Sequence, residues 1–214
     1  MKDFFSRHSY DMVKMFLNQF AIAVFGFSLT LAAVKADNAV LRNVTGVCAV
    51  LFYLFLLYTM TWDIGYKDKI SVETGKRKRN LFTGALISLC ANVPNFVFAV
   101  FIMLASLLNT EALSNIGGIC SSLALFLEGM YTGLLVNHVG GAPLNSYWFV
   151  YFLLPLPAIL ICWLSYNMGL RDIKFTTLFN HDKPVAHIPT IIDRLEMDDY
   201  YESPAKDKDK KEDD

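Results

Sequence analysis

Residues 44–62, VTGVCAVLFYLFLLYTMTW, and residues 63–80, DIGYKDKISVETGKRKRN, place an uncharged apolar stretch next to the most hydrophilic internal stretch of the chain. The apolar stretch ends with Tyr58 and Trp62, aromatic residues of the kind that lie at the headgroup level of a bilayer. About 20 apolar residues cross a membrane as a helix. The hydrophilic stretch carries six Lys or Arg residues, so the positive-inside rule predicts that residues 63–80 are cytoplasmic.

The composition extends this pattern to most of the chain. Of the 214 residues, 54 % are apolar and 18 % are charged. No Lys or Arg occurs between Arg79 and Arg171, and the acidic residues in that interval are Glu111 and Glu128. Apolar segments are predicted at residues 15–34, 44–62, 81–108, 115–139 and 147–166. The sequence therefore predicts an all-α polytopic integral membrane protein of four to five transmembrane helices, in the plasma membrane, with a cytoplasmic N-terminus.

The segment 115–139 is the ambiguous one, because it holds several Gly, Ser and other polar residues among its apolar ones. Residues 65–68, GYKD, and residues 169–172, GLRD, give two helices the same ending, which we interpret as a glycine cap followed by a cation and an aspartate. If both helices end on the cytoplasmic side, an even number of crossings separates them. We then favour four spans plus a re-entrant segment at 115–139, and the rival is a plain five-span protein with its C-terminal tail outside.

The chain changes character after the last apolar segment. We divide it into a transmembrane helical domain, residues 1–174, and a soluble, largely disordered acidic tail, residues 175–214. Residues 183–214 carry 10 acidic and 6 basic side chains, and residues 198–214 show no apolar pattern. Within the tail, Thr190–Met197 has the pattern of a short helix that docks on a partner, or else belongs to a fluctuating linker.

Three polar residues inside the apolar segments are candidates for a functional site. Glu128 is an ionisable group at expected bilayer depth, which is costly and therefore indicates function. Asn92 and Asn95 flank Pro94 in the third segment, where they either line a polar site with Glu128 or form hydrogen bonds between helices. Gln19 is expected nearer the membrane interface, one turn inside the first span.

Two other features are given structural roles. The G-x-x-x-G spacing of Gly129 and Gly133 predicts a close approach between helices. The basic run before the third segment sets topology and contacts anionic lipid headgroups; it consists of Lys76, Arg77, Lys78 and Arg79. This short run lacks interleaved aromatic residues, so we expect no nucleic-acid binding.

The sequence predicts a function only by class. The common motifs of nucleotide binding, zinc proteases and serine hydrolases are absent from it, and we expect no enzyme, cofactor or metal. The first hypothesis is a non-enzymatic accessory or scaffold subunit, which meets a membrane-protein partner through helix packing or through Thr190–Met197. The alternative is a small-solute transporter, or its membrane substrate-binding subunit, that uses Glu128 in a polar intramembrane cavity.

Overall fold

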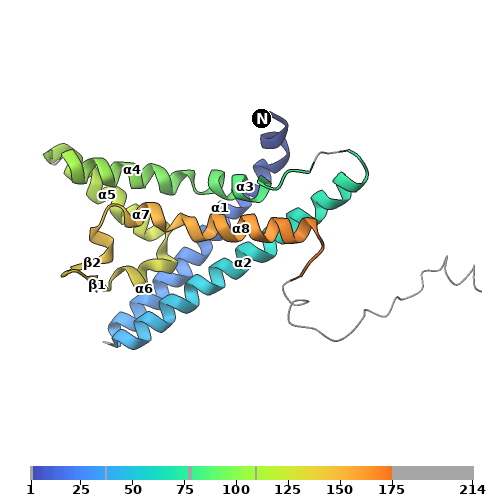
Figure 1. Ribbon diagram of the computed structural model, residues 1–214. Coiled ribbons are helices and arrows are strands. Elements are labelled where there is room, and N and C mark those ends of the chain that lie inside the picture. Colours follow the sequence, from blue (N-terminus) through green and yellow to red (C-terminus); the bar gives the residue numbers. More distant parts are fainter. Residues whose placement is uncertain (1, 37, 77–78, 109, 175–214) are drawn as a thin grey trace, which may run out of the picture. The chain divides into compact units, whose positions relative to one another are not determined.

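A computed structural model describes residues 2–36, 38–76, 79–108 and 110–174. The predicted tail, with Thr190–Met197, and the basic residues Arg77 and Lys78 lie outside these ranges. The described chain is almost entirely helical, as predicted (Figure 1). Its elements are α1 (Lys2–Lys35), α2 (Ala39–Glu73), α3 (Thr83–Ala91), α4 (Val93–Leu108), α5 (Glu111–Leu127), η1 (Gly129–Tyr131), α6 (Thr132–Leu135), β1 (His138–Val139), β2 (Ala142–Pro143), η2 (Leu144–Ser146), α7 (Val150–Leu153) and α8 (Pro155–Leu170).

The two longest helices, α1 and α2, pack against each other in antiparallel directions. The Phe25 and Phe52 rings lie 6.3 Å apart, and Asn18 Nδ2 donates to Met60 Sδ at 3.6 Å. Both helices are longer than the apolar segments that predicted them. The N-terminal extension of α1 is polar on one side, and it is held because its buried side chain His8 lies against α2.

Helix α8 runs parallel to α2, and glycines allow the two backbones to approach closely. A Cβ on Gly65 would collide with the carbonyl oxygen of Tyr166, and a Cβ on Gly169 with that of Trp62. The predicted caps are therefore wrong: both glycines lie inside their helices, at the packing contact. The chain after the end of α8 lies against the last part of α2, since Trp62 Nε1 donates to the Ile173 carbonyl at 2.8 Å and Lys69 Nζ lies 3.3 Å from Asp172 Oδ2. We call this the basic end of the bundle, which also includes the N-terminal part of α1.

The third apolar segment is broken near its proline. Helices α3 and α4 are bent by 55° at Asn92, two residues before Pro94. Proline has no N–H to donate to the carbonyl four residues earlier, so the regular hydrogen-bond pattern cannot continue through it. The last segment is also interrupted, at Leu154 between α7 and α8, and Pro155 opens α8.

The chain reverses direction between α5 and α6, which are bent by 82°. Helix α5 runs antiparallel to α4, towards the basic end, and η1 and α6 then return along α1. After α6, Asn137 Nδ2 donates to Asn43 Oδ1 at 2.7 Å, and Arg42 donates to Asn137 Oδ1 at 3.2 Å. Because Arg42 and Asn43 lie at the start of α2, the chain has come back to the end opposite the basic end. We call α5, η1 and α6 the hairpin.

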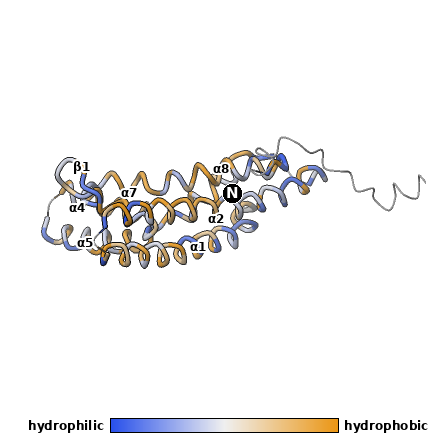
Figure 2. The backbone as a smooth tube through the Cα atoms, turned by 90° about the horizontal axis from the view of Figure 1, so that it is seen from below, coloured by the Kyte–Doolittle hydropathy of each residue, from blue (hydrophilic) through white to orange (hydrophobic). Residues whose placement is uncertain are grey.

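Apolar side chains cover the outside of the helices. Leu51, Phe55 and Leu160 are each about 60 % exposed, and the helices are mainly hydrophobic along their length, with hydrophilic residues gathered towards their ends (Figure 2). Three helices are long and apolar enough to cross a membrane, or five if each bent pair forms one span. Such surfaces need an apolar solvent or partner, and together with the helix lengths they indicate a membrane protein.

Candidate functional site

The site begins with the packing of α4 against α5. A Cβ on Gly117 would collide with the Cβ of Ala105, so the helices touch at this pair. Further along, Ala99 and Ala124 are both fully buried in one apolar cluster between the same helices. The two pairs define an antiparallel register, because the residue number falls along α4 as it rises along α5.

This register brings two of the predicted site residues to the same level. Asn95 lies one turn before Ala99, and Glu128 lies one turn after Ala124. Because α4 and α5 are antiparallel, one turn back along α4 and one turn forward along α5 lead towards the same end of the helix pair. Asn95 and Glu128 therefore lie at the same position along the axis of the α4–α5 pair. Each is beside the break in its own bent helix pair.

The tip of the hairpin packs on α1 at that level. A Cβ on Gly129 would collide with the carbonyl oxygen of Ala23, and a Cβ on Gly26 would lie 2.6 Å from Met130 Cα. Farther along the hairpin, a Cβ on Gly133 would lie 3.2 Å from Gly46 Cα of α2. The close approach predicted from the G-x-x-x-G spacing is thus confirmed, and α1 and α2 are the helices that use it.

Glu128 is buried at this tip. Glu128 is only 3 % exposed, and its Oε2 has no hydrogen-bond partner among the described residues. It interacts electrostatically with three tyrosines, Tyr53, Tyr131 and Tyr151. The Tyr131 hydroxyl also lacks a partner in the described chain, and the Tyr53 and Tyr131 rings meet edge to face at 6.4 Å. A carboxyl group and a phenol are thus buried in the same region, and each has an atom without a hydrogen-bond partner among the described residues.

The two asparagines are buried as well, but their hydrogen bonds are local. Asn92 Nδ2 donates to the Ser88 carbonyl at 2.9 Å, and Asn95 Nδ2 donates to Asn92 Oδ1 at 3.0 Å. These bonds fasten the break between α3 and α4, so they do not support the predicted hydrogen bonding between distant helices. Asn95 Oδ1 is left without a partner among the described residues.

A fourth residue, Gln19, joins this level. It was expected nearer the membrane interface; the structure buries it within the protein, where it is 1 % exposed and its Oε1 has no partner in the described ranges. It lies one turn before Ala23, and the neighbouring Phe20 ring contacts Phe126 of α5 at 5.7 Å. We call Gln19, Asn95, Glu128 and Tyr131 the polar belt. Gln19 and Tyr131 were not predicted as site residues, because a single Gln or Tyr in an apolar segment is common in helices without a functional site.

The polar belt holds buried acceptor oxygens that are not paired. Three of its atoms, Gln19 Oε1, Asn95 Oδ1 and Glu128 Oε2, have no hydrogen-bond donor among the described residues. A buried acceptor left unpaired costs about 1–3 kcal/mol. A proton, a small cation or a water molecule at these oxygens would remove that cost. Groups of three or more His, Cys, Asp and Glu side chains suited to a metal do not occur in the described residues.

The structure describes a cavity at another place. A cavity of about 500 Å³ opens between α1 and α2 near the basic end, and Glu128, Asn92 and Asn95 do not line it. Lys76 and Arg79 are exposed, as a topology determinant or lipid contact requires, but the structure does not test either role.

Comparisons with known proteins add no relative. No protein-family description, curated protein or solved structure matches this chain. The function is therefore argued from the geometry alone.

Proposed function

We propose that this protein is a membrane carrier for a small cation, the proton included, and that Glu128 is the carboxyl group that binds it. One observation carries the proposal: Glu128 Oε2 is buried at the tip of the hairpin with no hydrogen-bond partner in the described chain. Burying an ionisable group at membrane depth costs free energy, so such a group is a candidate for a functional role. Two broken helix pairs with polar residues at the breaks are the usual form of a membrane ion site.

The topology that supports this proposal has four spans and a re-entrant hairpin. The parallel directions of α2 and α8 (Figure 1) call for an even number of crossings between their ends, and α3–α4 and α7–α8 provide two. The hairpin then enters from the outer side and returns there, with Glu128 inside the bilayer. Its irregular backbone is covered by α1 and α2, which is the condition for such a segment in a membrane. The basic end, with the N-terminus and residues 63–80, is cytoplasmic in this arrangement.

The polar belt would work by exchanging its occupant with water on one side at a time. In the present conformation the belt is closed, since its residues are nearly fully buried. Gln19 and Asn95 supply oxygens from α1 and α4, whereas Glu128 supplies the charge from the hairpin. Movement of the hairpin against α1 would expose Glu128, and it would have to break the backbone contact of Gly129 with Ala23 and the packing of Phe126 on the aromatic rings of α1.

The test is cation flux into proteoliposomes. The purified full-length protein is reconstituted with a pH-sensitive dye inside the vesicles, and a potassium diffusion potential drives protons inward; parallel vesicles with a sodium dye test sodium. We expect Glu128→Gln to lower the flux at least about tenfold, since the amide cannot carry the charge. Glu111→Gln is the matched control, because Glu111 is an exposed residue at the start of α5, and its flux should equal that of the wild type.

A second measurement does not depend on the choice of ion. Dicyclohexylcarbodiimide is an apolar reagent that modifies protonated carboxyl groups in membranes, and peptide mass spectrometry should find it on Glu128 and not on Glu111. Equal fluxes from the wild type and Glu128→Gln, with no labelling at Glu128, would reject the carrier. The accessory-subunit hypothesis would then be the better one, and a stoichiometric membrane-protein partner that co-purifies with the protein would support it.

A further inference from the structure

The cavity between α1 and α2 is separate from the polar belt. It opens on the outer surface of the helix pair, because Lys14, Thr59 and Lys67 in its lining are exposed, whereas Met15 and Leu57 beside them are buried in the core. We call it the α1–α2 cleft. Its occupant therefore enters from outside the protein, at the cytoplasmic face of the bilayer in the proposed topology.

The lining of the cleft changes from apolar to charged along its length. On α2 it runs from Leu56 and Met60, at the deep end, to Asp63 and Lys67 near the basic end. At 1.5 Å per residue, Leu56 and Lys67 are about 16 Å apart along the helix. This length and the volume of about 500 Å³ suit a charged headgroup with the first part of an apolar chain.

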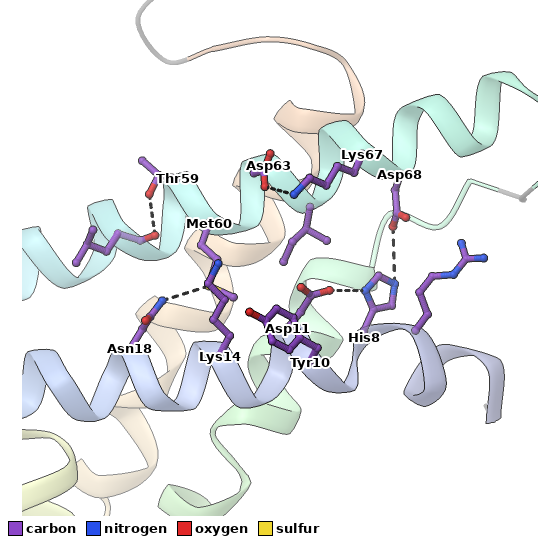
Figure 3. Close-up of a pocket in the computed structure, with 13 residues that line it drawn as sticks. His8, Tyr10, Asp11, Lys14, Asn18, Thr59, Met60, Asp63, Lys67 and Asp68 are labelled. Atoms are coloured by element: carbon purple, nitrogen blue, oxygen red, sulfur yellow. Dashed lines mark hydrogen bonds and ion pairs between the residues drawn. The ribbon is translucent and has the colours of Figure 1, made fainter.

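The charged end contains both signs in equal number. Three cations and three carboxylates line it: Arg7, Lys14, Lys67, Asp11, Asp63 and Asp68. Several of these are already engaged (Figure 3): Lys67 Nζ lies 2.6 Å from Asp63 Oδ2, and His8 Nδ1 lies 3.1 Å from Asp11 Oδ2. Arg7 and Lys14 make no hydrogen bond or ion pair with the described residues, although both side chains line the cleft.

We propose that the α1–α2 cleft binds a phospholipid whose headgroup carries a phosphate and a primary ammonium, as in phosphatidylethanolamine. Arg7 and Lys14 attract the phosphate. The exposed carboxylate of Asp63 accepts hydrogen bonds from the ammonium, which a quaternary choline group cannot donate. An anionic lipid without an amine would bring no donor to the exposed Asp63 carboxylate. The proposal is independent of ion transport, because none of the polar belt lines the cleft.

The test is competition between lipids on the purified full-length protein. Phosphatidylethanolamine, phosphatidylglycerol and phosphatidylcholine with identical chains are added in equal amounts, and native mass spectrometry measures the lipid that each protein molecule retains. We expect the wild type to retain phosphatidylethanolamine about tenfold over either competitor. Lys14→Ala should lower that retention about fivefold, whereas Lys76→Ala, a change on the same side but outside the cleft, should leave it unchanged.

A second pair of variants tests the ammonium end. Asp63→Asn should shift the preference towards phosphatidylglycerol, because the lining becomes net positive, and Glu73→Gln on the exposed end of the same helix should not. Equal retention of the three lipids, or equal effects of Lys14→Ala and Lys76→Ala, would overturn the proposal. Displacement of the lipid by equimolar soluble phosphoethanolamine would also overturn it, since the ligand would then be the free headgroup compound.

Discussion

A methyl group added at Gly65 tests the close packing of α2 against α8. The Cβ of Gly65→Ala would collide with the carbonyl oxygen of Tyr166, which belongs to the α8 backbone and cannot rotate away. Helices α2 and α8 must therefore separate. Overpacking of this kind costs about 1–3 kcal/mol, and the better helix propensity of alanine returns about 0.5–1 kcal/mol. We expect the free energy of unfolding to fall by about 1–2 kcal/mol.

Gly118→Ala is the matched control for this change. Gly118 lies inside α5, and a Cβ there would meet no atom within 4 Å. Only the propensity gain applies, so the variant should be more stable than the wild type by about 0.5–1 kcal/mol. The change in the free energy of unfolding caused by Gly→Ala is thus expected to have opposite signs in α2 and α5. Helix propensity alone cannot produce that difference.

The assay is unfolding by sodium dodecyl sulfate in mild-detergent micelles, followed by the fluorescence of Trp62 with the other two tryptophans replaced by phenylalanine. The Trp62 indole donates to the Ile173 carbonyl, so its emission reports the contact between α2 and α8. Adding Gly169→Ala to Gly65→Ala should cost less than the two single changes together, because helices already separated accept the second methyl more easily. A Gly65→Ala variant that is as stable as Gly118→Ala would refute the described packing of α2 on α8.

Two further predictions concern topology and a buried hydrogen bond. In a background without the four native cysteines, a membrane-impermeant maleimide should label His138→Cys in intact cells and Lys174→Cys only after permeabilisation; labelling of Lys174→Cys from outside would reject the re-entrant hairpin. Tyr166→Phe removes a hydroxyl that donates to buried Asp68 Oδ2 at 2.7 Å, and should lower the free energy of unfolding by about 1.5–3 kcal/mol. Tyr10→Phe, at a residue that is 73 % exposed, should change it by less than about 0.5 kcal/mol, and equal effects of the two changes would contradict the buried bond.

Some features of the site were within reach of the sequence. The break near Pro94 follows from the missing N–H of proline, and the close approach at Gly129 and Gly133 follows from their spacing. Glu128 was found because a lone carboxylate in an apolar segment is rare and costly. Each of these signals is local, because it depends on a residue and its near neighbours in the chain.

Other features were misread because their local signals are ambiguous. A glycine near a helix end is equally suited to a cap and to a close helix contact, and at Gly65 and Gly169 the contact decides. The positive φ near the end of α8 belongs instead to Asp172, at 57°. Gln19 is polar and near the start of an apolar segment, which fits the interface as well as the core; the packing of α1 on the hairpin decides that it is buried.

The sequence by itself determined that the chain forms several apolar helices, where most of them lie, and where proline interrupts them. These properties depend on the hydrophobicity and backbone chemistry of successive residues, which act over one or two turns. The tertiary structure alone decided that α2 and α8 are parallel, that the chain reverses at Glu128, and that Asn95 and Gln19 stand level with this carboxyl group. Such levels depend on the register between helices, and register is set by side-chain volumes at contacts between residues distant in the sequence, such as Ala105 with Gly117.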